Sequence, residues 1–280
     1  PLCPMTDDKE LSDIPVDQYE VAIFTNRFSS LQLQDSKIPS LELETNQATG
    51  TCDVVSYSSN HQDQFSNLPQ ERIELIIHAL SNRTQELLEN PNIKYILPFE
   101  NKGKEIGVTL DHPHGQIYSF GHIPEIIKRQ SIAQQGKPLE NYLSKIPEEL
   151  ILKKNSTGIC FVPRWARYPF EIWIVPYRRV PNIYSLSDDE KKDLAELMHD
   201  ASKRLDGVFD TPMPYTLAWQ LSPRGYENFH HFHLCFQPIR RSKTKLKYLA
   251  GVEQITGFFL VDLPPERSAG ILRGEEQPDE

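Results

Sequence analysis

Apolar positions along the chain follow the order strand, helix, strand, strand, and this order occurs twice. In the first half, an apolar run at 52–57 precedes a segment at 68–90 in which isoleucine and leucine recur with helical spacing. In the second half, an apolar run at 170–175 precedes a helical pattern that starts at Ser187, where the sequence Ser-Asp-Asp-Glu forms a capping box. Each half is therefore predicted to contain one helix with a single apolar face.

Each helical pattern leads into a further apolar run, at 95–99 in the first half and at 215–219 in the second. A glycine-containing loop then leads to two histidines separated by one residue, at 112–114 and at 231–233, and these pairs lie 119 residues apart. Repetition of the whole series of elements predicts that one α+β unit is duplicated. We expect an α+β fold of two similar halves, each an antiparallel sheet with a packed helix.

The domain boundary follows from this repeat. We assign residues 1–133 to the N-terminal half, which contains the His-Pro-His segment, and residues 134–280 to the C-terminal half. The polar stretch 134–156 is predicted to be the linker between them.

The composition of the chain argues against a nucleic-acid-binding, membrane-spanning or secreted protein. The 280 residues include 30 Lys and Arg against 39 Asp and Glu, a formal net charge of −9, and a negative protein is poorly suited to the phosphate backbone of nucleic acids. The chain has no run of 18 apolar residues, so no membrane span is expected. Its four cysteines do not make a disulfide framework and no secretion signal is evident, so we expect a cytoplasmic protein.

The segment 99–117 contains the residues best suited to catalysis. In an extended strand, the side chains of His112 and His114 project to the same side. That side offers either two metal ligands or one ligand beside one nucleophile. Gln116 follows, with an amide that can donate a hydrogen bond to an anionic oxygen.

Other histidines and cysteines bear on a metal site. Cys3 and His61 could join His112 in a zinc site, although a histidine pair of this kind is as often structural. In the second half, the histidines at 230–233 and Cys235 form a cluster that contains no Asp or Glu. A buried core strand and a metal site are both compatible with that cluster.

Two stretches of the first half resemble a known family. The sequence Phe-Glu-Asn-Lys-Gly at 99–103 and the sequence His-Pro-His-Gly-Gln-Ile at 112–117 resemble the signature of the galactose-1-phosphate uridylyltransferase family, within the histidine-triad superfamily. Segments 21–28, 1–4 and 245–253 resemble that family's nucleotide-binding strand, its Cys-x-x-Cys region and its lysine-containing segment. The resemblance covers nearly the whole chain and implies two histidine-triad-like halves.

The resemblance implies a two-step transfer of a nucleotidyl group. A uridylyl group would pass from UDP-glucose to His114 and then to galactose 1-phosphate, with Gln116 donating a hydrogen bond to the phosphoryl group. The substrates would be a nucleotide sugar and a sugar 1-phosphate, and the pathway galactose metabolism. A neutral imidazole suits this role because it attacks phosphorus and also leaves readily.

The same resemblance implies binding residues. Contacts to the nucleotide and its phosphates are implied for Asn26, Asn101, Gly107 and Thr109. Lys247 and Glu253 match residues that a second subunit lends to the site, which implies a homodimer.

A structural zinc is implied as well. Its ligands would be Cys3, His61 and His112, together with a cysteine upstream of residue 1. His112 would then anchor the segment that carries His114.

Some positions depart from the family pattern. Gln220 and Gln130 stand where some members have a histidine and a glutamate that help to bind a second metal, so a second metal site stays open. Arg27 replaces an acidic residue beside Asn26, and Thr109 replaces a serine, so the base of the donor stays open too.

Three alternatives remain on the sequence alone. A nucleotide-sugar phosphorylase or adenylyltransferase on the same scaffold would take AMP from an ADP-sugar onto His114. A catalytically idle, zinc-stabilised nucleotide-binding module would not need a nucleophile beside a phosphoryl donor. A metallohydrolase would use His112 and His114 as ligands, with Asp111 as the nearby candidate base.

Overall fold

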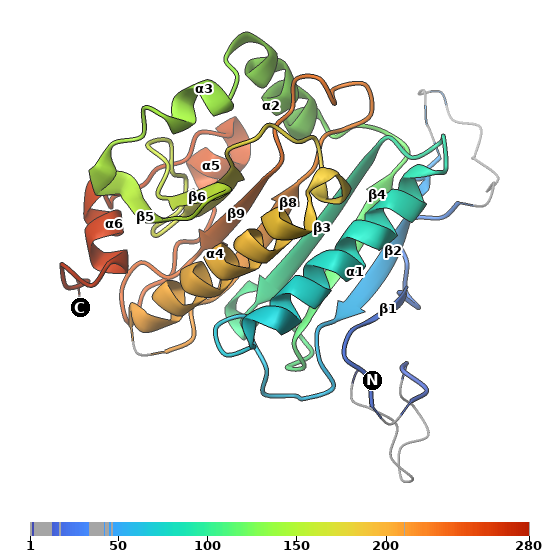
Figure 1. Ribbon diagram of the computed structural model, residues 1–280, viewed down its shortest axis with the longest axis horizontal. Helices are drawn as coiled ribbons and strands as arrows, with labels where there is room; N and C mark the ends of the chain where they lie inside the picture. The colour runs from blue at the N-terminus through green and yellow to red at the C-terminus, as the bar shows by residue number, and fades with distance from the viewer. Residues whose placement is uncertain are drawn as a thin grey trace.

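The structure, a computed structural model, describes residue 2 and residues 13–16, 18–33, 42, 45, 47–209 and 211–279. Within these residues the strands are β1 (Ala22–Thr25), β2 (Gly50–Ser56), β3 (Tyr95–Lys102), β4 (His114–Phe120), β5 (Ile151–Lys154), β6 (Gly158–Phe161), β7 (Ile172–Pro176), β8 (Tyr215–Gln220) and β9 (His233–Pro238). They form one antiparallel sheet in the order β1-β2-β4-β3-β8-β9-β7-β6-β5 (Figure 1).

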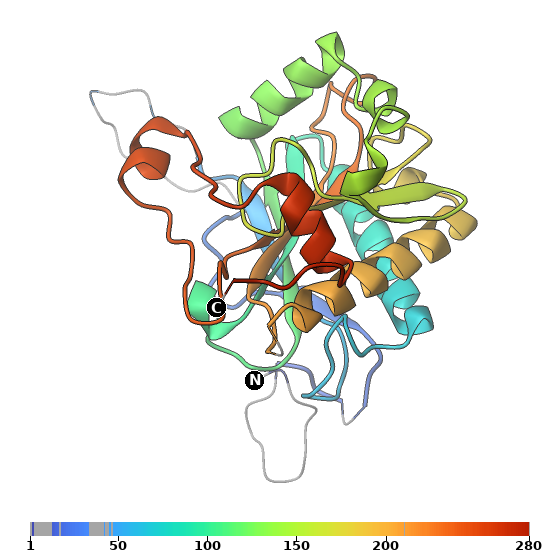
Figure 2. The ribbon, with the colours of Figure 1, turned by 90° about the vertical axis from the view of Figure 1, so that its left-hand side faces the viewer.

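Two long helices cover one face of this sheet. Helices α1 (Gln70–Leu88) and α4 (Asp188–Gly207) run side by side across it, and Figure 2 shows both on the same side of the strands. Their predicted apolar faces are buried in the core. The capping box of α4 is present, because the Ser187 hydroxyl accepts from the Glu190 backbone N–H and the Glu190 carboxylate accepts from the Ser187 backbone N–H.

The remaining helices are short. They are α2 (Glu125–Gly136), α3 (Glu140–Leu143), α5 (Gly251–Thr256) and α6 (Pro265–Leu272), with 3-10 turns η1 (Lys104–Ile106), η2 (Glu148–Leu150) and η3 (Ile183–Ser185). Among the described residues, no helix combines the length and the apolar composition needed to span a bilayer.

The two halves contribute equivalent strands in the same order, counted from the middle of the sheet outwards. Strands β3 and β8 are neighbours at the centre, followed by β4 and β2 on one side and by β9 and β7 on the other. Each half therefore repeats strand, helix, strand, strand, as β2-α1-β3-β4 and as β7-α4-β8-β9. The predicted α+β fold class is confirmed, and the sheets of the two halves join into one through β3 and β8.

The stretch 134–156 is not the linker that its polarity predicted. It contains the end of α2, all of α3 and the start of the strand pair β5–β6. Its apolar residues form a second small core with those of the neighbouring strands; the members are Leu139, Leu143, Ile146, Leu150, Ile151, Ile159, Phe161 and Val175. The prediction was wrong because α3 spans only four residues, which is too short for helical periodicity to appear in the sequence.

Candidate active site

Strand alternation places the candidate catalytic residues on the open face of the sheet, the face opposite α1 and α4. On β4, His114 and Gln116 are partly exposed, whereas Gly115 between them is buried. On β3, Asn101 is partly exposed in the same way. The β3–β4 register pairs Phe99 with Gln116. Asn101 and His114 lie beyond this last pair, both partly exposed on the open face, and both line the same pocket.

His114 is held by its own segment of chain. Its Nδ1 atom lies 2.8 Å from the carbonyl oxygen of His112. Since a carbonyl oxygen can only accept, Nδ1 carries the hydrogen and donates. Nε2 therefore keeps the lone pair in the neutral ring, and it is the ring atom that can attack an electrophile.

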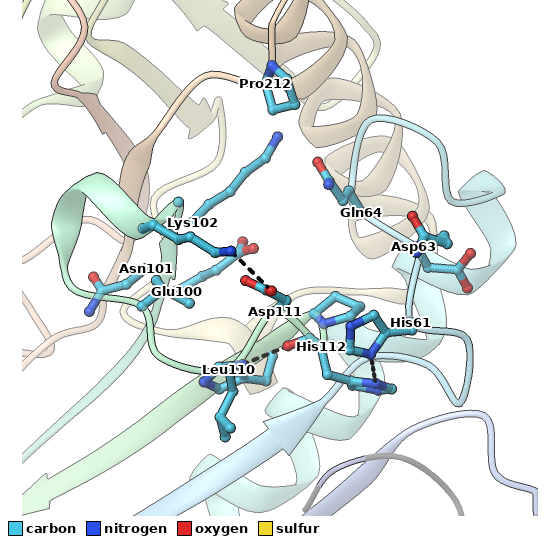
Figure 3. Close-up of a pocket in the computed structure, with 16 residues that line it drawn as sticks. His61, Asp63, Gln64, Glu100, Asn101, Lys102, Leu110, Asp111, His112 and Pro212 are labelled. Carbon is cyan, nitrogen blue, oxygen red and sulfur yellow. Dashed lines mark hydrogen bonds and ion pairs between the residues drawn. The ribbon is translucent and has the colours of Figure 1, made fainter.

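His112 is buried between segments that are far apart in the sequence. Its Nε2 donates to the carbonyl oxygen of Ser58 at 2.7 Å and lies 3.1 Å from the hydroxyl of Tyr19. Its Nδ1 then carries the lone pair and faces Nδ1 of His61 at 3.2 Å (Figure 3). Burial lowers the pKa of His112, which favours the neutral ring. The two histidines thus have different partners, which favours one anchored histidine beside one nucleophile.

A pocket of about 420 Å³ opens beside this segment (Figure 3). Residues 61–64, 100–104 and 110–114, together with Val108 and Pro212, line it, whereas Gly107 and Thr109 are not among its lining residues. Lys104 and Asp111 form an ion pair at 3.2 Å among its lining residues. The pocket is large and polar enough to hold a small charged ligand.

A buried cluster of charged groups ties the end of β3 to α4. The Lys102 ammonium lies 2.7 Å from both carboxylate oxygens of Asp206. Glu100 faces the same side and is also buried. Burial raises the pKa of Glu100 to about 8; Lys102 opposes this shift and Asp206 adds to it. Glu100 is therefore mostly a neutral acid at pH 7, and the cluster carries little net charge.

The other candidate nucleotide contacts of the first half lie on separate loops. Asn26 follows β1 directly, and its side-chain oxygen accepts from the backbone N–H of Phe28 at 2.9 Å. Gly107 ends η1 with φ of 84°, a conformation that favours glycine, while the space where a Cβ would lie is open. Thr109 is exposed. The structure thus groups His114, Gln116 and Asn101 more closely than these three.

Lys247 and Glu253 contact each other in a different part of the molecule. Nζ of Lys247 lies 3.0 Å from a carboxylate oxygen of Glu253 and donates to the carbonyl oxygen of Leu260 at 2.5 Å. Both residues line a second pocket, which shares no lining residue with the first. Apart from Arg241 and Lys247, the lining of this pocket comes from the segment 248–262, which we call the arm because it projects from the sheet (Figure 2).

The second histidine pair is enclosed. Nδ1 of His233 lies 2.9 Å from the carbonyl oxygen of His231, as in the first half. However, Trp173 stacks on the His233 ring, and burial lowers the pKa of His233 to about 3. No three His, Cys, Asp or Glu side chains among the described residues are arranged to hold a metal ion. For this cluster, the interpretation as a core strand is therefore favoured.

Two contributors to the site carry no signal in the sequence. The hydroxyl of Tyr19 contacts His112 and also donates to the carbonyl oxygen of Leu2 at 2.8 Å. Thr216, on a strand of the second half, contacts Asn101. Both contacts join residues that are far apart in the sequence, so no local sequence motif predicts them. Cys3, the third candidate ligand, lies outside the described residues.

Two family models match the chain almost from end to end. One describes the N-terminal domain of galactose-1-phosphate uridyl transferase and matches residues 1–124, and the other describes the C-terminal domain and matches residues 129–277. A protein of Thermotoga maritima named galactose-1-phosphate uridylyltransferase is 33% identical over 273 residues, covering 93% of this chain and 86% of the relative.

Solved structures agree with these matches. A structure described as a uridylyltransferase mutant has a TM-score of 0.90 at 29% identity and covers 98% of this chain and 92% of that one. An ADP-glucose phosphorylase from Arabidopsis thaliana has a TM-score of 0.80 at 22% identity over 93% and 83% of the two chains, which shows a shared fold. The chain belongs to the galactose-1-phosphate uridyl transferase family.

Proposed function

We propose that this protein transfers a uridylyl group from UDP-glucose to galactose 1-phosphate through a uridylyl-histidine at His114. The observation that carries the proposal is the hydrogen bond from Nδ1 of His114 to the carbonyl oxygen of His112. This bond leaves Nε2 as the nucleophilic atom of the ring. Family membership and the name of the Thermotoga maritima relative support the same activity.

The chemistry takes place in two displacements at one phosphorus. Nε2 attacks the α-phosphorus of UDP-glucose, the bond to the bridging oxygen breaks, and glucose 1-phosphate leaves with the electron pair. A phosphate oxygen of galactose 1-phosphate then attacks the same phosphorus, the N–P bond breaks, and UDP-galactose leaves. Between these steps the substituted ring is positively charged, and the His112 carbonyl stabilises it by accepting from Nδ1.

Amides on the open face stabilise the phosphoryl group. Gln116 lies on the same face of the sheet as His114, and Asn101, on the neighbouring strand, lines the same pocket as His114. Donors of this kind are worth about 3 kcal/mol in the transition state when they are preorganised. Asn26, Gly107 and Thr109 are the further proposed contacts of the nucleotide.

His61 and His112 suit a structural zinc. Two nitrogen ligands of a tetrahedral zinc, each at about 2.0–2.1 Å, lie roughly 3.3 Å apart, and the two Nδ1 atoms are 3.2 Å apart. Cys3 is the proposed third ligand, supported by Leu2, whose carbonyl oxygen is bound by the Tyr19 hydroxyl beside His112. Bound zinc would hold these segments together and add folding free energy. The proposed displacements do not pass through it.

A homodimer would complete the site by contributing Lys247 and Glu253 from the second chain. The arm contains Glu253 and directly follows Lys247, and it exposes large apolar side chains, with Tyr248 71%, Ile255 85% and Phe258 74% exposed. Apolar surface of this extent is typical of an interaction face. The proposed assembly is therefore a homodimer, and its proposed location is the cytoplasm.

Labelling of the enzyme tests the activity. The full-length protein is incubated with UDP-glucose that is radiolabelled at the α-phosphate, then denatured and assayed for acid-labile, base-stable label. We expect label on the wild type and none on His114→Ala. The matched control is His78→Ala, since His78 lies on α1, on the opposite face of the sheet.

The remaining arms of this experiment separate the alternatives. Galactose 1-phosphate should chase the label from the wild type. Label from ADP-glucose but not from UDP-glucose would instead support the phosphorylase. Absence of label with both donors would exclude a covalent mechanism.

A further inference from the structure

Thr216 connects the second half of the protein to the site in the first half. Its Oγ1 atom donates to Oδ1 of Asn101 at 3.1 Å. The two residues are direct partners in the β3–β8 ladder, and both are partly exposed. Side chains of directly paired residues lie on the same face, so Thr216 shares the open face with Asn101 and His114.

This contact determines which end of the Asn101 amide is available. An asparagine side chain has an acceptor oxygen and an NH₂ group with two donor hydrogens. Because the Thr216 hydroxyl occupies the oxygen, the NH₂ group is the end left for a ligand on the open face. The reversed amide would present its oxygen instead, and an oxygen repels the negative oxygens of a phosphate.

We propose that Thr216 is a positioning residue, which holds the Asn101 amide in the orientation that donates to the phosphates of the nucleotide sugar. This inference rests on the proposed uridylyl transfer at His114. Threonine suits the task because its β-branched side chain is restricted at χ1, so the hydroxyl is held in place. The second half, whose own histidine pair is enclosed, would thus contribute to catalysis in the first.

Two substitutions separate the hydroxyl from the shape of the side chain. Thr216→Val keeps the branched shape and removes the donor, whereas Thr216→Ser keeps the donor. Loss of a preorganised donor costs about 10²–10³ in rate, and a misoriented donor should cost less. We expect Thr216→Val to slow labelling of His114 by about tenfold and Thr216→Ser by about twofold or less, with unchanged thermal unfolding midpoints.

A double-mutant cycle tests whether Thr216 acts through Asn101. In an Asn101→Ala background, Thr216→Val should cause no further loss, because the amide that it orients is gone. A labelling rate of Thr216→Val equal to the wild type would overturn the inference. A further tenfold loss in the Asn101→Ala background would overturn it too, as would failure of Thr216→Ser to retain the rate.

Binding measurements distinguish failure of the positioning role of Thr216 from failure of the proposed uridylyl transfer. UDP-glucose affinity is measured by calorimetry for His114→Ala with and without Thr216→Val. If the wild type is not labelled but Thr216→Val weakens binding about tenfold, the proposed chemistry fails and the positioning role stands. If the wild type is labelled and Thr216→Val changes neither rate nor binding, the positioning role fails alone.

Discussion

Trp173 stacks on His233, with ring centroids 4.3 Å apart and ring planes inclined by 20°. His233 occupies the position in the second half that His114 occupies in the first, and its Nδ1 makes the same bond to a backbone carbonyl. The second half therefore repeats the hydrogen bond that orients the histidine ring, but Trp173 covers the ring and no substrate can reach it. We expect one labelled histidine per chain, which peptide mapping of the labelled protein would identify.

Enclosure of His233 predicts how stability depends on pH. Its pKa is about 3 in the folded protein, mainly because of burial, and about 6.5 in an unfolded chain. Between these values the unfolded state binds more protons, so the free energy of unfolding falls as the pH decreases below about 6.5. His230, whose pKa burial lowers to about 4, acts in the same direction. Each histidine contributes a slope of up to about 1.4 kcal/mol per pH unit.

Urea unfolding at about pH 7, 6 and 5 checks this dependence. His233→Phe keeps a ring against Trp173 and cannot titrate, so its slope should be shallower than that of the wild type. Glu190, whose pKa is lowered mainly by the hydrogen bond from Arg178, loses its contribution only as the pH falls through values below 4.5. Glu100, whose pKa burial raises to about 8, acts in the opposite direction across this window, but equally in both proteins, so the difference between the two slopes isolates His233. Equal slopes in the two proteins would contradict the prediction.

Gly115 on β4 leaves room for the hydroxyl of Tyr57. A Cβ atom on Gly115 would clash with the Tyr57 hydroxyl and lie 2.9 Å from the carbonyl oxygen of Phe99. We expect Gly115→Ala to lower the free energy of unfolding by about 1–3 kcal/mol, as overpacking usually does. It should also slow labelling of His114, because the strand must shift. Denaturant unfolding and the labelling rate measure the two effects.

Gly136 provides the matched control for this substitution. An added Cβ there meets no atom within 4 Å and Gly136 ends helix α2, so Gly136→Ala should not lower the free energy of unfolding and should leave labelling unchanged. Removing the clashing hydroxyl with Tyr57→Phe should recover part of the stability lost in Gly115→Ala. If the double variant is no more stable than Gly115→Ala, the clash with Tyr57 is not the cause.

Metal content is the fourth testable property. We expect the full-length protein to bind close to one zinc per chain, and His61→Ala to lose it. Chelation should lower the thermal unfolding midpoint of the wild type but not that of His61→Ala, because zinc binding contributes to folding. Elemental analysis and thermal unfolding measure both. A wild type that contains no zinc would contradict the proposed site.

The protein should hold no second metal at Gln130 and Gln220. The side-chain oxygens of Gln130 and Gln220 are buried and make no hydrogen bond within the described part of the chain. An amide oxygen is a weaker ligand for zinc or iron than imidazole or carboxylate. We expect the double substitution Gln130→Glu and Gln220→His to add about one bound metal per chain. Two equivalents in the wild type would show that the amides suffice.

Subunit mixing tests whether Lys247 serves the site of a partner chain. In such a dimer, each site combines His114 of one chain with Lys247 of the other. When a His114→Ala chain pairs with a Lys247→Ala chain, one site contains both substitutions and the other site contains neither. Equimolar exchange should then restore about a quarter of wild-type activity, since half of the dimers are mixed and each has one intact site. Mixing His114→Ala with Gln116→Ala is the control, because both residues belong to one chain's site and no recovery is expected. Recovery equal to this control would exclude the shared site.

The parts of the fold that could be predicted depend on local patterns. Patterns among neighbouring residues predict the two long helices and the capping box at Ser187. The His-Pro-His segment is likewise recognised from adjacent residues. The duplication then repeats these patterns, which made the order of elements evident. By contrast, the short elements of 134–156 are too brief to show a period.

The parts that could not be predicted depend on distant contacts. Thr216 reaches Asn101 only because β3 pairs with β8, and that pairing joins the two halves. Tyr19 approaches His112 across 93 residues of sequence. The stacking of Trp173 on His233 likewise requires β7 to lie beside β9. The sequence shows which residues can react, whereas the register decides which are accessible.

The pairing of β3 with β8 also decides what would happen to a divided chain. It runs from Phe99 opposite Ala218 to Lys102 opposite Tyr215, at the centre of the sheet. A fragment that contains one half would expose the whole side of its central strand, with unpaired N–H and C=O groups open to any other strand. Each half protects the other from aggregation, so co-expressed fragments should reassemble, whereas either fragment alone should be insoluble.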